Sequence, residues 1–468
     1  MSLQGFYLLP HPPIIIPEVG KGEEKKINAT SESFYSIGKD IAEKGPDTIV
    51  LITPHGTMFQ DAIALSYEDE VSGNLKNFGV FGVDIKVTIN KPLTSKIYEL
   101  AYNERIPSVM VTNSILRNYN ISLSLDHGAM VPLYFINKYY NNYKLVHITY
   151  TALSDSDLYK FGMCISEAVE ELNENAILIA SGDLSHKLKE DGPYGLDPAG
   201  EKFDKEFLHY LEKGDVKGVF TIDKKIIHNA GECGRRSIAI LLGSLEGKKF
   251  NGELLSYEST FGVGYGVMKF NIISEDSSKL EELEALRREN LERRKNIRNP
   301  YVKLALESLT TYLKTGKELE QIPSYVTEEM KNLKRGVFVS LKKHENLRGC
   351  IGTIFPVTNS VAEEIIRNAI EAGINDPRFN EVEEDELEDI FFYVDVLTEP
   401  EATKKEELNP KKYGVIVSYK GRRGLLLPDI EGVDTVEQQL SIALEKAGIG
   451  PYEGYEIEKF KVIRHKED

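Results

Sequence analysis

The 468-residue chain is too long for one ordinary hydrophobic core, so two unequal domains are expected. Its 74 acidic and 57 basic side chains give a formal charge of -17, which repels nucleic acid and anionic membrane surfaces. Only three cysteines occur, without any Cys-x-x-Cys pair, which argues against a disulfide framework and against a zinc finger.

The first residues carry neither the basic stretch nor the apolar core of a signal peptide. No later window approaches the roughly 18 uninterrupted apolar residues of a membrane-spanning helix. We therefore expect a cytoplasmic protein with no membrane partner and no nucleic-acid partner.

The first half of the chain has the pattern of an α/β domain. From Gly5 to about Ile273, short apolar runs bounded by Gly, Pro and Asn alternate with longer helical patterns, as in a central sheet flanked by helices. The runs that read as buried strands are residues 6–9, 48–52, 144–148 and 176–180.

A charged stretch with leucines at helical spacing separates the two halves, and it predicts a connecting helix. After Pro300 the pattern predicts a separate, smaller α+β domain. Its predicted elements are helices at 301–313 and 361–372 and strands at 390–397 and 413–419. The expected division is an α/β domain at 1–274, a linker at 275–296 and the α+β domain at 297–468.

Histidines recur where predicted strands end. His11, His55 and His186 each follow an apolar run, and ligands collect outside the carboxyl ends of strands in such sheets. His127 stands just ahead of an apolar run and predicts a helix start, where the helix dipole disfavours protonation and suits an acid/base role. One such histidine is more often structural than functional, but four at similar positions favour a site.

A carboxylate and a thiol follow each other at the start of another predicted helix. Glu232 precedes the apolar run 238–242, where a carboxylate either caps the helix or completes a metal site with two histidines.

The order of five short motifs resembles that of the class III, LigB-type extradiol dioxygenases. They are His-Pro-Pro at 11–13, Pro-His-Gly at 54–56, Asp-His-Gly at 126–128, Asp-Leu-Ser-His at 183–186 and Ala-Gly-Glu-Cys-Gly at 230–234. The resemblance implies that His11, His55 and Glu232 hold Fe(II), with His186 and His127 as acid/base and substrate-orienting groups. It also implies a small catechol-like aromatic substrate and dioxygen.

The same residues are similar to those of the Memo-like proteins, in which the resemblance implies a cysteine among the metal-binding residues. A Cys233 thiolate favours a softer ion such as copper, with zinc as a further alternative, and suits a redox or binding role rather than ring cleavage. The Ala-Gly before Glu232 matches the dioxygenase pattern, so Glu232 is the preferred ligand from sequence.

The C-terminal part resembles the AMME syndrome candidate protein family through the sequences at 347–353, 375–379 and 423–428. Fusion of the two halves resembles the AmmeMemoRadiSam system, which implies a separate radical-SAM protein as partner. The resemblance also implies self-association.

Arg348 and Cys350 form a candidate second site within Leu-Arg-Gly-Cys-Ile-Gly-Thr. A neighbouring guanidinium would lower the pKa of the thiol and make it nucleophilic or redox-active. The alternative is a small buried side chain between glycines that allow close backbone passage. His147, His209, His344 and His465 are expected to be structural.

Overall fold

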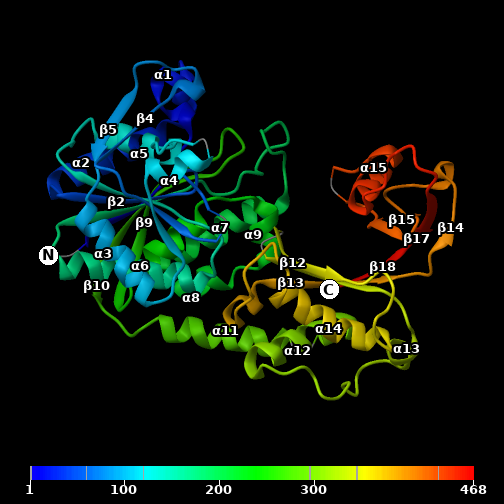
Figure 1. Cartoon of the computed structure of the whole chain (residues 1–468). Helices are drawn as coiled ribbons and strands as arrows, with labels where there is room; N and C mark the ends of the chain where they lie inside the picture. Colours follow the sequence, from blue (N-terminus) through cyan, green and yellow to red (C-terminus); the bar gives the residue numbers. More distant parts are fainter. Residues whose placement is uncertain are drawn as a thin grey trace. The chain divides into compact units, whose positions relative to one another are not determined.

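The computed structural model describes residues 3–59, 61–119, 121–294, 297–343, 346–430 and 432–467. The chain divides into two compact units, Met1–Ala285 and Leu286–Asp468, called unit 1 and unit 2 below. The division falls within the charged helix expected at 275–296, which is α11 (Leu280–Arg294) (Figure 1). Residues 295 and 296 of that stretch lie outside the described residues.

Unit 1 is built on an eight-stranded sheet. Its strands are β1 (Leu3–Leu9), β2 (Thr48–Thr53), β3 (Ile63–Ser66), β6 (Ser108–Val111), β7 (Lys144–Thr149), β8 (Ala176–Ser181), β9 (Lys248–Glu258) and β10 (Tyr265–Glu275). Their order is β6-β3-β7-β2-β8-β1-β10-β9. The four strands predicted from sequence are the parallel centre, β7-β2-β8-β1, while β10 pairs antiparallel with β1 and β3 with β7. A separate hairpin joins β4 (Glu70–Asn74) and β5 (Asp84–Thr88).

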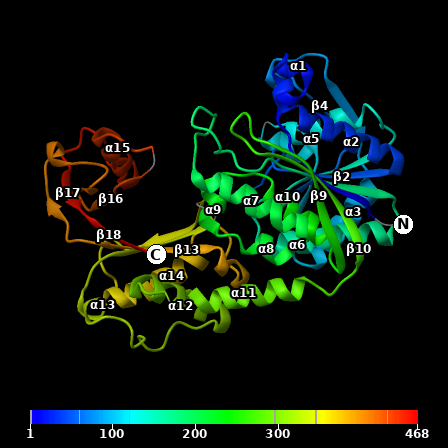
Figure 2. The ribbon, with the colours of Figure 1, turned by 180° about the vertical axis from the view of Figure 1, so that it is seen from behind.

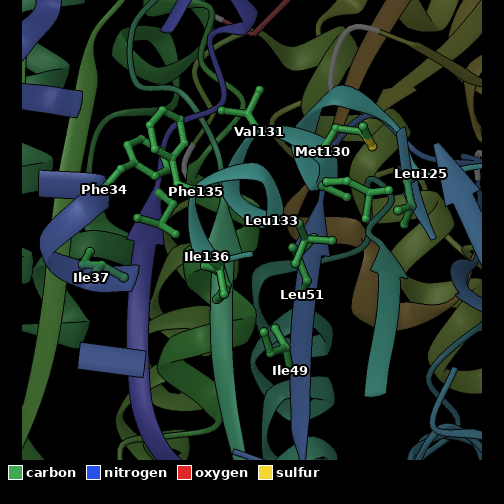
Figure 3. Packing of buried hydrophobic residues seen from close by; sticks show 14 of the residues in the cluster. Phe34, Ile37, Ile49, Leu51, Leu125, Met130, Val131, Leu133, Phe135 and Ile136 are labelled. Carbon is green, nitrogen blue, oxygen red and sulfur yellow. The ribbon is translucent and has the colours of Figure 1, made fainter. Parts of the chain in front are cut away.

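Helices cover both faces of this sheet, which explains why its central strands read as continuous apolar runs (Figure 2). One face packs against α2 (Asn28–Lys44) and α5 (His127–Ile136), where Phe34, Leu51 and Phe135 share a core (Figure 3). The remaining helices are α1 (Pro17–Gly20), α3 (Lys91–Asn103), α4 (Asn113–Leu116), α6 (Asp155–Glu171), α7 (Pro198–Lys213), α8 (Val216–Thr221), α9 (Lys224–Ala230) and α10 (Arg235–Gly243). The predicted α/β class is confirmed.

Unit 2 holds two four-stranded antiparallel sheets, ordered β12-β11-β13-β18 and β14-β17-β15-β16. Their strands are β11 (Val337–Lys343), β12 (Asn346–Gly352), β13 (Ile390–Leu397), β14 (Glu401–Ala402), β15 (Gly414–Tyr419), β16 (Arg422–Leu426), β17 (Glu456–Phe460) and β18 (Val462–Lys466). The helices are α12 (Pro300–Thr315), α13 (Glu328–Asn332), α14 (Val361–Ile374) and α15 (Val436–Ala447). Helices α12 and α14 pack on the first sheet and α15 on the second, so the predicted α+β class is confirmed.

Helices α6 and α10 of unit 1 cross with their backbones in contact. A methyl group at Gly162 would lie 1.9 Å from the carbonyl oxygen of Ile240, and one at Gly243 would lie 1.8 Å from that of Tyr159. This crossing fixes α10 beside β8, and the turn that precedes α10 carries part of the site described below.

We expect Gly162→Ala to lower the free energy of unfolding by about 1–3 kcal/mol, because the added carbon forces the two helices apart. Urea unfolding followed by circular dichroism measures this change. Glu167→Ala, an exposed position on the same helix, is the control and should stay within about 0.5 kcal/mol of the parent. Equal stabilities of the two variants would contradict the close crossing.

Candidate metal centre

Two of the predicted histidines meet at the carboxyl ends of the central strands. His11 follows β1 and His55 follows β2, and their Nε2 atoms lie 3.1 Å apart with the ring planes at 85° to each other. His11 is buried, whereas His55 is exposed, so the pair opens toward solvent on one side.

The third member of this group is Cys233, in the turn between α9 and α10. Its Sγ lies 3.6 Å from His11 Nε2, and the three possible ligand atoms of His11, His55 and Cys233 all lie within 4.8 Å of one another. A tetrahedral ion with bonds of about 2.1 Å to nitrogen and about 2.3 Å to sulfur separates N from N by about 3.4 Å and N from S by about 3.6 Å. Both distances to His11 Nε2 are close to these values, so the three residues form a group that could hold a single ion.

Glu232, the ligand preferred from sequence, does not join this group among the described residues. Its Oε2 accepts a hydrogen bond from the backbone N–H of Arg235 at 2.6 Å, at the start of α10. The first N–H groups of a helix have no partner within the helix, and the Glu232 carboxylate satisfies one of them. The structure therefore places the alternative residue, Cys233, rather than Glu232 beside the two histidines.

A hydroxyl fixes the tautomer of His11. Ser181 Oγ donates its single hydrogen to the carbonyl oxygen of Gly128 at 2.6 Å, so at 2.9 Å it accepts from Nδ1–H of His11. The lone pair of His11 is thereby on Nε2, the atom that faces His55 and Cys233. Burial lowers the pKa of His11 to about 3, so the ring is a neutral donor at physiological pH.

Two further imidazoles border the group. His127 is the first residue of α5, as predicted, and stacks on His55 with 4.3 Å between ring centroids. His186 stacks on Tyr194 at 5.1 Å, and its buried Nε2 has no hydrogen-bond partner within the described part of the chain. Burial lowers the pKa of both rings, which leaves them neutral and able to accept a proton.

Two acidic residues near the histidines, Asp126 and Asp183, were not predicted from sequence as part of the site. Asp126 caps α5 through Gly128 N at 2.8 Å and also binds His147 Nε2 at 3.2 Å. Burial alone would raise the pKa of Asp126, but the hydrogen bond from His147 holds it well below its usual range. The Asp-His-Gly sequence could have indicated the cap, whereas nothing in the sequence indicates the His147 contact.

Asp183 is the second residue that was missed. Its Oδ1 accepts from the backbone N–H of His11 at 2.7 Å, and its own N–H faces Cys233 Sγ at 3.3 Å. This carboxyl group is buried, and burial raises its pKa. Asp183 therefore joins the backbone of His11 to the side chain of Cys233.

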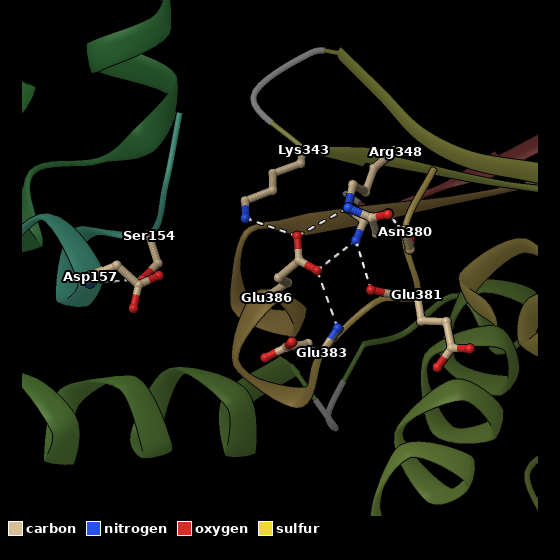
Figure 4. Close-up of polar contacts among 8 residues, drawn as sticks. All are labelled: Ser154, Asp157, Lys343, Arg348, Asn380, Glu381, Glu383 and Glu386. Carbon is tan, nitrogen blue, oxygen red and sulfur yellow. Dashed lines mark hydrogen bonds and ion pairs between the residues drawn. The ribbon is translucent and has the colours of Figure 1, made fainter. Parts of the chain in front are cut away.

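The candidate second site in unit 2 is not assembled as expected. The Arg348 guanidinium forms a two-pronged ion pair with Glu386, at 3.0 and 2.7 Å, and donates to the carbonyl oxygen of Asn380 at 2.8 Å (Figure 4). Burial raises the pKa of Cys350 rather than lowering it, and the cation that opposes this rise is Arg378. Arg348 thus joins β12 to the segment around Glu386 and does not activate the thiol.

Two of the histidines expected to be structural make such contacts. His147 bridges Ser66 Oγ and Asp126, and His465 stacks on Tyr301 with ring centroids 3.7 Å apart. His344 lies outside the described residues.

Residues 5–268 match the catalytic LigB subunit of aromatic ring-opening dioxygenase as a family. The chain belongs to this family. Members of the LigB family are generally metal-dependent, in keeping with the group at His11. Residues 302–466 match the AMMECR1 family, so the two resemblances read from the motifs are confirmed.

Some relatives match the whole chain, and others match only part of it. Protein CA_C1420 of Clostridium acetobutylicum is 69% identical over 467 residues, which is 100% of both chains. A Thermotoga maritima protein is 52% identical over 171 residues, covering 36% of this chain and 98% of its own. The solved structure of an uncharacterized protein, PH0010 from Pyrococcus horikoshii, is 32% identical and covers 36% of this chain and 91% of its own, with a TM-score of 0.34. Within the described residues no helix is long and apolar enough to cross a membrane.

A buried carboxyl group supports the segment before His186. Asp204 on α7 accepts from the backbone N–H of Ser185 at 2.8 Å and from the Tyr257 hydroxyl at 2.7 Å. Burial raises its pKa to about 7, against an ordinary value of 3.8. Between pH 3.8 and about 7 the folded chain holds a proton on Asp204 that the unfolded chain releases. The contribution of Asp204 to the free energy of unfolding therefore falls as pH rises through this range.

We therefore expect the unfolding free energy of the parent, measured relative to Asp204→Asn, to fall as pH rises from about 4 to about 7. Urea unfolding of both proteins across this range measures the difference. A difference that does not change with pH would contradict the assigned titration.

Proposed function

We propose that unit 1 is a metal-dependent oxidoreductase centre whose ion is bound by His11, His55 and Cys233. The observation that carries this proposal is that His11 Nε2 lies 3.1 Å from His55 Nε2 and 3.6 Å from Cys233 Sγ, close to the separations expected around a single ion. The fixed tautomer of His11 and membership of the LigB family support it.

The donor set bears on the identity of the metal. Two imidazoles and a thiolate form a softer environment than two imidazoles and a carboxylate, and therefore favour copper or zinc more than the Fe(II) expected from the dioxygenase resemblance. Zinc has no redox chemistry, so oxidative chemistry requires copper or iron. When bound, such an ion would supply Lewis acidity and electron transfer.

The surrounding residues would bind the substrate and move its protons. His127 and His186 are neutral bases beside the donor group, and each can take the proton of a phenolic hydroxyl. Asp126 holds His127 at the start of α5 and so keeps its ring against His55. A small phenolic compound with dioxygen as co-substrate fits these roles.

Extradiol ring cleavage of a catechol by Fe(II) is the second candidate. Family membership favours it, as does the unpartnered buried Nε2 of His186, which suits acid/base transfer to a ring substrate. Extradiol cleavage by Fe(II) usually uses a carboxylate as the third ligand. Glu232 would therefore have to give up the hydrogen bond that it accepts from the backbone N–H of Arg235. A separate radical-SAM partner and self-association stay predictions under either function.

Metal analysis of purified variants tests the ligand set. We expect Cys233→Ala and His11→Ala to lose metal affinity at least about tenfold, whereas Glu232→Gln, which keeps an oxygen to cap α10, retains it. Loss of metal in Glu232→Gln with retention in Cys233→Ala would contradict the proposal and favour the carboxylate geometry.

Assays with a catechol panel separate the two functions. Oxygen uptake without yellow ring-opened product is expected for the thiolate-bound redox centre, and ring-opened product identifies the second candidate. His186→Asn should retain the metal while the rate falls about 100-fold, as for loss of a general base. No oxygen uptake with copper or iron present would refute both.

A further inference from the structure

One buried tyrosine of unit 1 differs from the others in its hydrogen bonding. Tyr7, Tyr150 and Tyr159 each donate to a carboxylate or to a backbone carbonyl oxygen, at 2.5 to 2.7 Å. Tyr265 is only 4% exposed, yet its hydroxyl has no hydrogen-bond partner in the part of the chain that the structure describes. Leaving a buried hydroxyl without a partner is costly, so Tyr265 is the member of this set that is available to a ligand.

The sheet places Tyr265 beside a proposed metal ligand. Strands β1 and β10 pair antiparallel, with Leu8 opposite Met268. Continued by three residues, this register brings Tyr265, the first residue of β10, opposite His11. Tyr265 belongs to the core that contains α2 and α5, and the His11 ring lies 5.3 Å from that of His127 at the start of α5. Both side chains therefore lie on the same face of the sheet.

A short backbone pairing fixes this position. The N–H of Gly264 donates to the carbonyl oxygen of Ser185 at 2.8 Å, and the N–H of Leu184 donates to that of Gly264 at 2.8 Å. The residue directly before Tyr265 is thereby attached to the segment that carries His186. The start of β10 and the loop after β8 are thus held together at the metal centre.

Two polar groups of the centre lie close enough to act on the Tyr265 hydroxyl. Burial raises the pKa of Tyr265, and the Asp183 carboxyl group and the Tyr194 hydroxyl raise it further. The hydroxyl therefore keeps its proton at neutral pH and is a hydrogen-bond donor. Tyr194 is 60% exposed and its ring stacks on His186, so it borders the centre from the solvent side.

We propose that Tyr265 is a substrate-binding residue of the metal centre, whose hydroxyl donates a hydrogen bond to an oxygen of a phenolic substrate that the Tyr194 ring covers. A donor held in a buried position forms a stronger hydrogen bond with an ionised oxygen than with a neutral one, which favours the phenolate form. The assignment rests on the metal-dependent function proposed for unit 1.

Binding of 4-nitrocatechol to the full-length, Co(II)-loaded protein under nitrogen tests the proposal. The cobalt–thiolate absorbance reports the metal site, and the nitrocatecholate absorbance reports the bound probe. We expect Tyr265→Phe to keep the cobalt spectrum and to raise the Kd of 4-nitrocatechol about tenfold, the effect of losing one hydrogen bond to a charged oxygen. A purely structural role would shift the urea midpoint and leave the Kd unchanged.

Tyr143→Phe is the matched control. It removes a hydroxyl that donates to Asn137 just before β7, at the opposite end of the parallel strands, and should leave the Kd unchanged. Tyr194→Ala should raise the Kd about threefold through loss of the ring contact, whereas Tyr102→Ala, at an exposed position of α3, should not. The Tyr194 pair keeps the test decisive if Tyr265→Phe does not fold.

The outcomes separate this inference from the function on which it rests. Equal Kd values for the parent and Tyr265→Phe, with the cobalt spectrum intact, would overturn the role of Tyr265 and leave the metal centre standing. The same holds if the cobalt-loaded parent does not bind 4-nitrocatechol. A parent protein that binds no cobalt would overturn the proposed function, and the role of Tyr265 with it.

Discussion

The close contact between the backbones of Gly182 and Gly234 determines where Cys233 lies. A methyl group at Gly182 would be 2.1 Å from the Cα of Gly234, so a side chain there would separate the end of β8 from the turn before α10. With this contact made, Cys233 N donates to the carbonyl oxygen of Asp183 at 3.2 Å, and Gly182 N donates to that of Leu9 at 3.0 Å. The ends of β1 and β8 and the turn before α10 are thereby joined, and His11 meets Cys233.

Electrostatics then make the group suitable for a cation. The four imidazoles of His11, His55, His127 and His186 are neutral because burial lowers their pKa values. Burial also raises the pKa of the Cys233 thiol, so a thiolate there needs a positive charge beside it. A metal ion supplies that charge without displacing protons from the imidazoles. Burial therefore leaves neutral imidazole donors, and a thiolate at Cys233 requires the ion.

The sequence was sufficient for the framework and for part of the site. The four central strands were predicted because strands covered on both faces are uninterrupted apolar runs, and His11 and His55 were located because they follow such runs directly. The choice between Glu232 and Cys233 was not available from sequence, since neighbouring residues point in different directions and the outcome depends on the hydrogen bond that the N–H of Arg235 donates to Glu232. The ion pair of Arg348 was not available from sequence for a similar reason, because its partner Glu386 is 38 residues away along the chain.

X-ray absorption at the edge of the bound metal tests the central claim most directly, since it reports the elements that surround the ion. The account predicts one sulfur at about 2.3 Å together with nitrogen neighbours at about 2.0–2.1 Å, and loss of the sulfur signal in Cys233→Ser. A spectrum of the parent protein with only nitrogen and oxygen neighbours, unchanged in Cys233→Ser, would contradict it.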